Sequence, residues 1–129
     1  MAEVLYKPGY SRSWALVIGI NAYHHLQPLS YACNDADSVA ATLPPLGFSP
    51  EQILILKDAE ASKSRILDAY LAFHEKANDP DDRVIFFFAG HGHTVQGSHG
   101  HIGYLVPVDG KDDNLNSLIR WDELTRNAD

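Results

Sequence analysis

A histidine between two glycines follows an unbroken apolar run. Residues 84–89 (VIFFFA) are rich in β-branched and aromatic side chains, and Gly90-His91-Gly92-His93 comes directly after them. Such a run predicts a β-strand that is buried on both faces. Reacting groups gather at the carboxyl edge of an open parallel sheet, and an imidazole there can act as a general base near neutral pH. His91 is therefore a candidate catalytic residue; the alternative is a surface histidine in a glycine turn.

Further histidines suggest a second kind of chemistry. The chain contains two His-Gly-His units, at 91–93 and 99–101. Histidine is a common zinc ligand, so a small zinc hydrolase is one reading of the cluster. No carboxylate lies at a tight ligand spacing beside these units, and the glycines leave the direction of the rings open. We therefore assign no metal site and expect His99 and His101 to lie in a solvated loop.

A cysteine and an aspartate precede the first expected helix, within residues 31–37 (YACNDAD). In a parallel sheet this loop lies at the same edge as His91. Asp35 could bind a basic side chain of a substrate, or it could cap the helix. Cys33 could pair with a histidine as a nucleophile, or it could be a small packed residue. Both alternatives stay open at the level of the residues.

The elements that position these groups alternate along the chain. Continuous apolar runs predict strands near 14–20, 52–57 and 83–89, and Gly19 indicates a close backbone approach or close packing. Asn34-Asp35 predicts the N-cap of a first helix that ends before Pro44, and Ser62 or Ser64 the cap of a second. This order predicts right-handed crossovers and a three-layer α/β sandwich with a mostly parallel sheet.

The residue pattern changes after His91, where the chain becomes rich in Gly and His. We expect a hairpin there, with residues 104–108 as a short edge strand that contains a proline. A closing helix is expected around residues 121–124. Nothing in the pattern indicates a second complete domain.

Composition limits the function classes. The chain has 129 residues, 45% of them hydrophobic, and a formal net charge of −7. Without a basic cluster it is not expected to bind nucleic acid or an anionic membrane surface. No apolar run approaches the roughly 20 residues of a membrane span, and the N-terminus lacks the features of a signal peptide. A single cysteine fits a reducing compartment, so we expect a cytoplasmic protein.

Four blocks, taken in order, carry a family resemblance. They are residues 15–21 (ALVIGIN), 34–36 (NDA), 87–92 (FFAGHG) and 103–109 (GYLVPVD). Together they resemble the caspase-like cysteine peptidases, and most of all the metacaspase and bacterial caspase-homologue branch. The likeness runs from about Trp14 to the end of the chain. It implies the caspase-like (caspase-hemoglobinase) fold, with residues 1–12 as an N-terminal arm and residues 13–129 as the N-terminal part of a peptidase domain.

The resemblance also implies roles for three residues. The histidine of the Gly-His-Gly block is the catalytic base of the family, which corresponds to His91. The amide of Gly92 is implied as an oxyanion-hole donor, which stabilises charge on the scissile carbonyl oxygen. Asp35 matches the residue with which metacaspases bind Arg or Lys before the scissile bond. Residues 26–37 contain no Arg or Lys, unlike the corresponding loop of caspases, which bind acidic side chains.

One component of the family is absent from the sequence. Its nucleophilic cysteine lies about 50 residues after the histidine, whereas this chain ends 38 residues after His91, at Asp129. We therefore expect a fold that is incomplete here, with an unpaired sheet edge, and a chain that is inactive alone. Its expected partners are a protein or peptide substrate and the rest of the domain, which carries the cysteine. The alternative is a non-catalytic caspase-like scaffold.

Some members of the family need calcium, which aspartates after the histidine bind. Asp109 and Asp122 are candidate counterparts in this chain. A match of two residues is too short to assign a ligand set. No cofactor is therefore assigned, and calcium dependence is left open.

Overall fold

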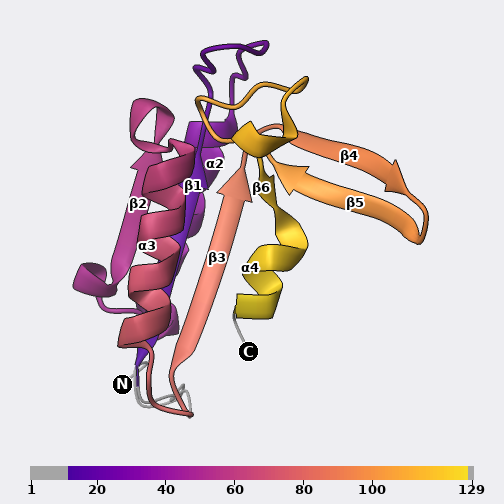
Figure 1. The fold of residues 1–129 in the computed structure, drawn as a ribbon. Helices are drawn as coiled ribbons and strands as arrows, with labels where there is room; N and C mark the ends of the chain where they lie inside the picture. The colour runs from indigo at the N-terminus through magenta and orange to yellow at the C-terminus, as the bar shows by residue number, and fades with distance from the viewer. Residues whose placement is uncertain (1–11, 128–129) are drawn as a thin grey trace.

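The centre of the fold is a parallel three-stranded sheet. The structure, a computed structural model, describes residues 12–127, so residues 1–11 of the expected arm lie outside the described residues. The strands are β1 (Ser13–Gly19), β2 (Ile53–Lys57) and β3 (Arg83–Ala89), in the spatial order β2-β1-β3 (Figure 1). All three expected strands are confirmed to within one residue.

Helices cover both faces of this sheet. Helix α2 (Ala32–Thr42) lies on one face and α3 (Lys63–Lys76) on the other (Figure 1). Alternate residues of β1 enter two separate cores. Ala15 and Val17 pack with α2, whereas Leu16 and Ile18 pack with α3. The expected three-layer α/β architecture is confirmed.

The burial expected for β3 is wrong. Val84 is 41% exposed, and the other residues of this strand are half-buried. The physical reason is the sheet order, because among residues 12–127 only β1 pairs with β3. Among the described residues one long edge of β3 is therefore open, and an unpaired sheet edge was expected.

The expected start of the first helix is also wrong. Asn34 was expected to be the N-cap, but α2 begins at Ala32 and contains Asn34. The cap comes from farther away: the side-chain oxygen of Asn21 accepts hydrogen bonds from the backbone N–H groups of Ala32 (2.9 Å) and Cys33 (3.3 Å). A side chain in the preceding loop thus satisfies the orphan donors of the helix.

Close packing and local capping explain two other features. A Cβ atom on Gly19 would lie 2.7 Å from the carbonyl oxygen of Ala32, so the expected close approach is confirmed. Ser62 caps α3 by accepting a hydrogen bond from Arg65 N–H (3.3 Å), as expected for one of the two candidate serines.

A second, antiparallel sheet follows His91. It consists of β4 (Gly92–Gly97), β5 (Gly100–Leu105) and β6 (Ile119–Arg120), and β4 and β5 form a hairpin that projects from the body (Figure 1). The expected hairpin is confirmed, but the expected strand at 104–108 is wrong. Strand β5 ends at Leu105, and the buried residues 106–108 bond to other parts of the chain.

Short elements complete the chain. Helix α4 (Trp121–Asn127) closes the described part, as expected. Within the described residues, four 3₁₀ segments connect the larger elements: η1 (Pro44–Leu46), η2 (Pro50–Gln52), η3 (Asp58–Glu60) and η4 (Leu115–Ser117). None of the helices within residues 12–127 has the length and apolar character needed to cross a bilayer.

Candidate active site

His91 lies between the carboxyl end of β3 and the start of β4. Its Nε2 atom is 2.8 Å from the backbone carbonyl oxygen of Gln27. A carbonyl oxygen only accepts hydrogen bonds, so Nε2 carries a proton in this arrangement. In the neutral ring the other nitrogen, Nδ1, is then the basic one. The imidazole is thus held in the tautomer in which Nδ1 can accept a proton.

Tyr23 holds the backbone of the same residue. Its hydroxyl accepts a hydrogen bond from His91 N–H (2.7 Å) and donates one to the carbonyl oxygen of Val106 (2.8 Å). The two rings are also in contact, with centroids 4.8 Å apart. Burial raises the pKa of Tyr23 to about 12, while the bond from His91 acts in the opposite direction. The tyrosine is therefore neutral at ordinary pH and keeps the proton that it donates.

Tyr23 and Gln27 both belong to the loop after β1, and the start of this loop is held by side chains. The carboxylate of Asp58 accepts hydrogen bonds from the backbone N–H groups of Asn21 (2.8 Å) and Ala22 (2.9 Å). These bonds lower the pKa of Asp58 below its ordinary value, and the bond from Ala22 has the larger effect. Because the Asn21 side chain also caps α2, Asp58 and Asn21 together fix the start of the loop against β2 and α2.

The amide of Gly92 faces an open edge. Val106 N–H donates to the carbonyl of His91 (3.0 Å), and the Tyr23 hydroxyl links the His91 N–H to the Val106 carbonyl, so these two residues, one position before the β4–β5 ladder, extend its hydrogen-bonded positions. Such pairs alternate along an antiparallel ladder. The next pair, Gly92 with Leu105, therefore turns its backbone groups away from each other. The N–H of Gly92 points to the side of β4 that has no partner strand among the described residues.

Asp35 and Cys33 lie in the first turn of α2. The side chain of Asp35 is exposed, and its backbone N–H donates to Tyr31 (2.8 Å). The thiol of Cys33 donates to the carbonyl oxygen of Gly19 (3.4 Å). Burial, and then the nearby Asp58 carboxylate, raise the pKa of Cys33. A raised pKa lowers the thiolate fraction, which is the opposite of what activates a nucleophile.

The other histidines do not gather around one point. His93 is half-buried beside Tyr104, His99 lies in the hairpin turn, and His101 is exposed on β5. His101 is therefore on a strand rather than in the expected loop. Within residues 12–127, no group of three or more His, Cys, Asp or Glu side chains is placed to hold a metal ion.

The two candidate calcium aspartates have other contacts. Asp109 accepts a hydrogen bond from Lys63 N–H (3.0 Å) at the start of α3. Asp122 forms an ion pair with Arg120 (2.7 Å). The two carboxylates thus serve different elements, and neither observation assigns a cofactor.

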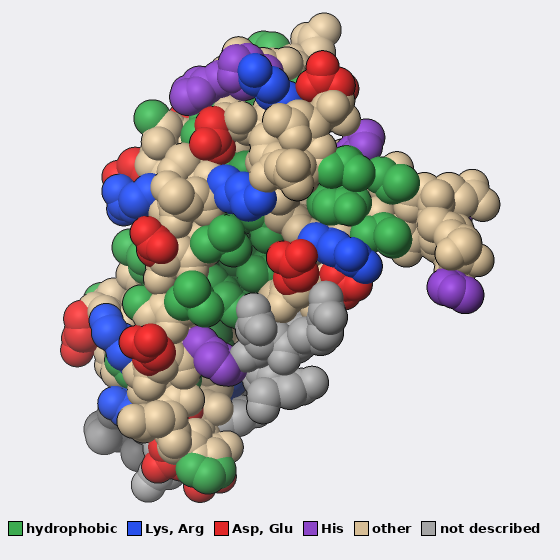
Figure 2. Space-filling model, in the orientation of Figure 1, with side chains coloured by type: hydrophobic (Ala, Val, Ile, Leu, Met, Phe, Trp, Pro, Cys, Tyr) green, Lys and Arg blue, Asp and Glu red, His purple; other side chains and the backbone are tan. Residues whose placement is uncertain are grey.

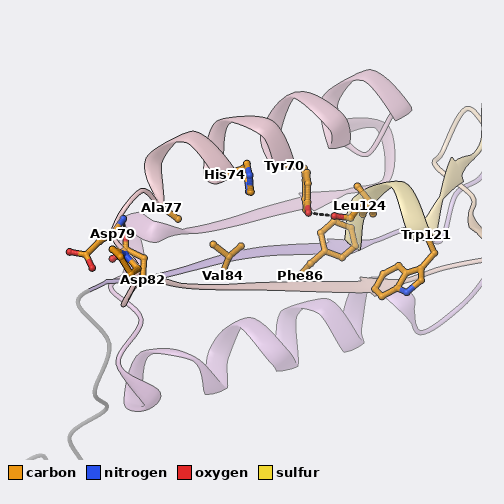
Figure 3. A pocket seen from close by; sticks show the side chains of 10 residues that line it. Tyr70, His74, Ala77, Asp79, Asp82, Val84, Phe86, Trp121 and Leu124 are labelled. Atoms are coloured by element: carbon orange, nitrogen blue, oxygen red, sulfur yellow. Dashed lines mark hydrogen bonds between the residues drawn. The ribbon is translucent and has the colours of Figure 1, made fainter. Parts of the chain in front are cut away.

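A cavity of about 510 Å³ lies away from His91, along the open edge of β3. Figure 3 shows that Val84 and Phe86 of β3 form part of its wall, with Tyr70 and His74 of α3 on one side. Trp121 of α4 lies at one end. The Tyr70 hydroxyl donates to the carbonyl of Leu124 and so ties α3 to α4. Figure 2 shows hydrophobic side chains gathered on this face of the molecule.

The sequence indicates His91 as a candidate but does not indicate the residues that hold it. Tyr23 and Gln27 stand in a polar loop without periodicity, and Asp58 follows β2 without any distinctive neighbour. One signal was available: the loop follows the central strand, so its polar residues must lie at the same sheet edge as His91. Which of these residues contacts the imidazole is decided only by the fold.

Comparisons with known proteins agree on one family. The family model described as "Caspase domain" matches residues 12–127. Metacaspase-2 of Trypanosoma brucei brucei is 34% identical over 85 residues, which are 60% of this chain and 24% of that protein. A Desulfuromonadales protein named as a probable protease is 30% identical over 125 residues, which are 84% of this chain and 15% of that protein. The chain thus spans a quarter or less of the length of these curated relatives.

A solved structure shows the same fold. The crystal structure of protein GSU0716 from Geobacter sulfurreducens superposes with a TM-score of 0.68. The match covers 90% of this chain and 44% of that chain, at 22% sequence identity. At this identity the likeness concerns the fold.

Proposed function

The chain belongs to the caspase-domain family, and from this premise we propose that it is the histidine-bearing part of a cysteine endopeptidase that cleaves after Arg or Lys. The family supports a cysteine-protease-like function. The observation that carries the finer proposal is the hydrogen bond between His91 Nε2 and the carbonyl of Gln27. It leaves Nδ1 as the nitrogen that can remove a proton from a thiol.

The proposed reaction needs a cysteine from outside these 129 residues, because the sole cysteine of the chain is Cys33. His91 Nδ1 takes the thiol proton, and the sulfur attacks the scissile carbonyl carbon. The Gly92 N–H donates a hydrogen bond to the oxyanion that forms. His91 then gives its proton to the leaving amine, which departs and leaves a thioester. Water, deprotonated by His91, hydrolyses the thioester and restores the thiol.

Asp35 is the proposed partner of the substrate's basic side chain. Its carboxylate is exposed at the first turn of α2, at the sheet edge where the loop carrying Gln27 also lies. The neighbouring Asp37 is less suited, because it already pairs with Lys57 (3.1 Å). An unneutralised carboxylate favours Arg or Lys through charge complementarity.

The open edge of β3 is where we place the segment with the nucleophile. A further parallel strand there would end at the same sheet edge as His91, because the carboxyl ends of parallel strands share one edge. It would also cover Val84 and Phe86, which are only partly buried in the described chain. The remainder of the domain is thus a proposed partner of this face.

The test is substitution of the base in the intact protein. We expect His91→Ala to lower kcat/KM for a peptide with a single Arg by at least about a hundredfold, as for loss of a general base. His93→Ala is the matched control, since His93 lies two residues away in the same unit and faces Tyr104. Equal activity of His91→Ala and wild type would reject the proposal and leave the non-catalytic scaffold.

A further inference from the structure

The open edge of β4 begins at the proposed catalytic residues. Strand β4 is the outer strand of the second sheet, and within residues 12–127 its only partner is β5. Its first residue, Gly92, directly follows His91. Thr94 and Gln96 have the same position in the ladder as Gly92, so their backbone groups also point to the open edge. Three successive outward-facing residues thus run away from His91 in a line.

This edge lacks the features that usually prevent strand pairing. Exposed edge strands are commonly protected by Lys, by Pro or by a bulge. Strand β4 (GHTVQG) contains no Lys, Arg, Asp, Glu or Pro, and its six residues pair with β5 in unbroken register. A Cβ atom placed on Gly92 would have only the carbonyl oxygen of Tyr104 within 4 Å, at 3.7 Å, so no described side chain crowds the face of the sheet at the start of this edge.

The chemistry determines which part of a substrate lies beside β4. The base that takes the thiol proton later gives it to the leaving amine, so the residues after the scissile bond depart on the side of His91. That part of a peptide runs from amino to carboxyl end away from the reacting carbonyl. Strand β4 also runs away from His91 in the amino-to-carboxyl direction. The two chains are therefore parallel.

We propose that the residues after the scissile bond bind as a parallel strand on the open edge of β4; this rests on the proposed peptidase function. Adding a strand to a sheet edge is a known way to bind extended peptides. In a parallel pair, the N–H of each edge-facing residue donates to a carbonyl of the other strand, that of the residue before the one directly opposite. Its carbonyl accepts from the N–H of the residue after the one directly opposite.

The register follows from the oxyanion contact. If the Gly92 N–H binds the scissile carbonyl oxygen, the Gly92 carbonyl accepts from the N–H of the second residue after the scissile bond. The N–H of Thr94 then donates to the carbonyl of that same second residue. The Thr94 carbonyl accepts from the fourth residue. The N–H groups of the first and third residues point away from β4.

Methylation of single substrate amides tests this register in the intact wild-type protein. We expect N-methylation at the second residue after the scissile bond to lower kcat/KM about tenfold, the loss typical of one hydrogen bond. The same change at the third residue is the control and leaves kcat/KM within about twofold. Equal effects at both positions would overturn the proposal.

A variant of the protein gives an independent measurement. Thr94→Pro removes an edge-facing N–H that the β4–β5 ladder does not use, and Thr94→Val keeps it. We expect residues after the scissile bond to raise kcat/KM over that of a short reporter with an aminocoumarin leaving group. Thr94→Pro should reduce this advantage at least about fivefold, and Thr94→Val should keep it. A similar advantage in both variants would count against the proposal.

The short reporter separates this inference from the proposed function. Cleavage of the reporter without any gain from the added residues rejects the strand-pairing proposal and leaves the peptidase. Failure to cleave the reporter and the longer peptides rejects the peptidase itself. Dimerisation that Thr94→Pro abolishes, without an effect on the substrate advantage, would make this edge an interface between two copies and overturn the proposal.

Discussion

Two neutral groups hold His91, one at its ring and one at its backbone. The Gln27 carbonyl fixes one ring nitrogen, and the Tyr23 hydroxyl fixes the backbone N–H of the same residue. Neither contact adds a charge beside the imidazole. Both contacts orient His91 without forming an ion pair with it. The orientation of His91 thus comes from the loop after β1 rather than from a carboxylate.

Removal of the Tyr23 hydroxyl tests this arrangement. Tyr23→Phe leaves the ring contact with His91 but deprives the His91 N–H and the Val106 carbonyl of a partner in a buried position. We expect the free energy of unfolding to fall by about 1–3 kcal/mol, measured by urea denaturation. Tyr31→Phe is the control, because Tyr31 is 74% exposed. Equal stability of both variants would contradict the role of the hydroxyl.

Specificity provides a second prediction for single residues. We expect Asp35→Asn to lower kcat/KM for an Arg-containing peptide about tenfold or more, since it removes the proposed charge partner of the substrate. Asp37→Asn is a matched control in the same helix, because the Asp37 carboxylate pairs with Lys57. A larger loss of kcat/KM for Asp37→Asn than for Asp35→Asn would contradict the proposed role of Asp35 and assign it to Asp37.

Asp58 contributes to how the stability of the fold changes at acidic pH. Its backbone hydrogen bonds lower its pKa in the folded chain below the ordinary value of 3.8. The carboxylate form therefore stabilises the fold above that value, and this contribution is lost as the pH falls through the folded pKa. We expect Asp58→Asn to flatten the decline of the free energy of unfolding between about pH 5 and pH 2. Urea denaturation at each pH measures this free energy. An unchanged slope would contradict this assignment.

At the scale of elements, the loop after β1 and helix α2 form one unit. Asn21 caps the helix, and its own backbone is held by Asp58. The loop carries Tyr23 and Gln27, so the stability of the helix start and the position of the imidazole depend on the same contacts.

The cap is tested by two asparagines. We expect Asn21→Ala to destabilise the chain by about 1 kcal/mol, as for the loss of an N-cap. Asn34→Ala is expected to be near neutral or slightly stabilising, because Asn34 lies exposed within α2 and alanine favours helix. Thermal and urea unfolding distinguish the two. The reverse order would place the cap at Asn34, where the local sequence indicates it.

Elements dictated by local pattern could be predicted from the sequence, and long-range contacts could not. The strands follow from continuous apolar runs, and Ser62 caps α3 from an adjacent position. The start of α2 was missed because Asn21, its cap, lies 11 residues before Ala32. His91 could be proposed as a candidate from its glycine neighbours and the strand before it. Its partners Tyr23 and Gln27 could not, because their contacts exist only after the strands and helices have packed.

At the scale of the whole molecule, β3 has two different edges. Arg83 N–H donates to Arg12 (2.8 Å), and the Ala89 carbonyl accepts from Ile20 (3.0 Å). In a parallel ladder alternate residues bond to the same neighbour, so the odd-numbered residues of β3 bond to β1. The backbone groups of the even-numbered ones, Val84, Phe86 and Phe88, face the open edge, along which the cavity lies. The described fold thus contains a strand with half of its ladder unused.

Hydrogen exchange measures whether a further strand completes this ladder. In the 129-residue chain we expect the amides of Val84, Phe86 and Phe88 to exchange at least about tenfold faster than those of Ile85 and Phe87, because only the latter two donate to β1. In the intact protein the difference should disappear, since a strand that brings the nucleophile would accept from all three. Ile85 and Phe87 serve as internal controls within the same strand. Persistence of the alternation in an intact, active protein would show that the nucleophile reaches His91 by another path.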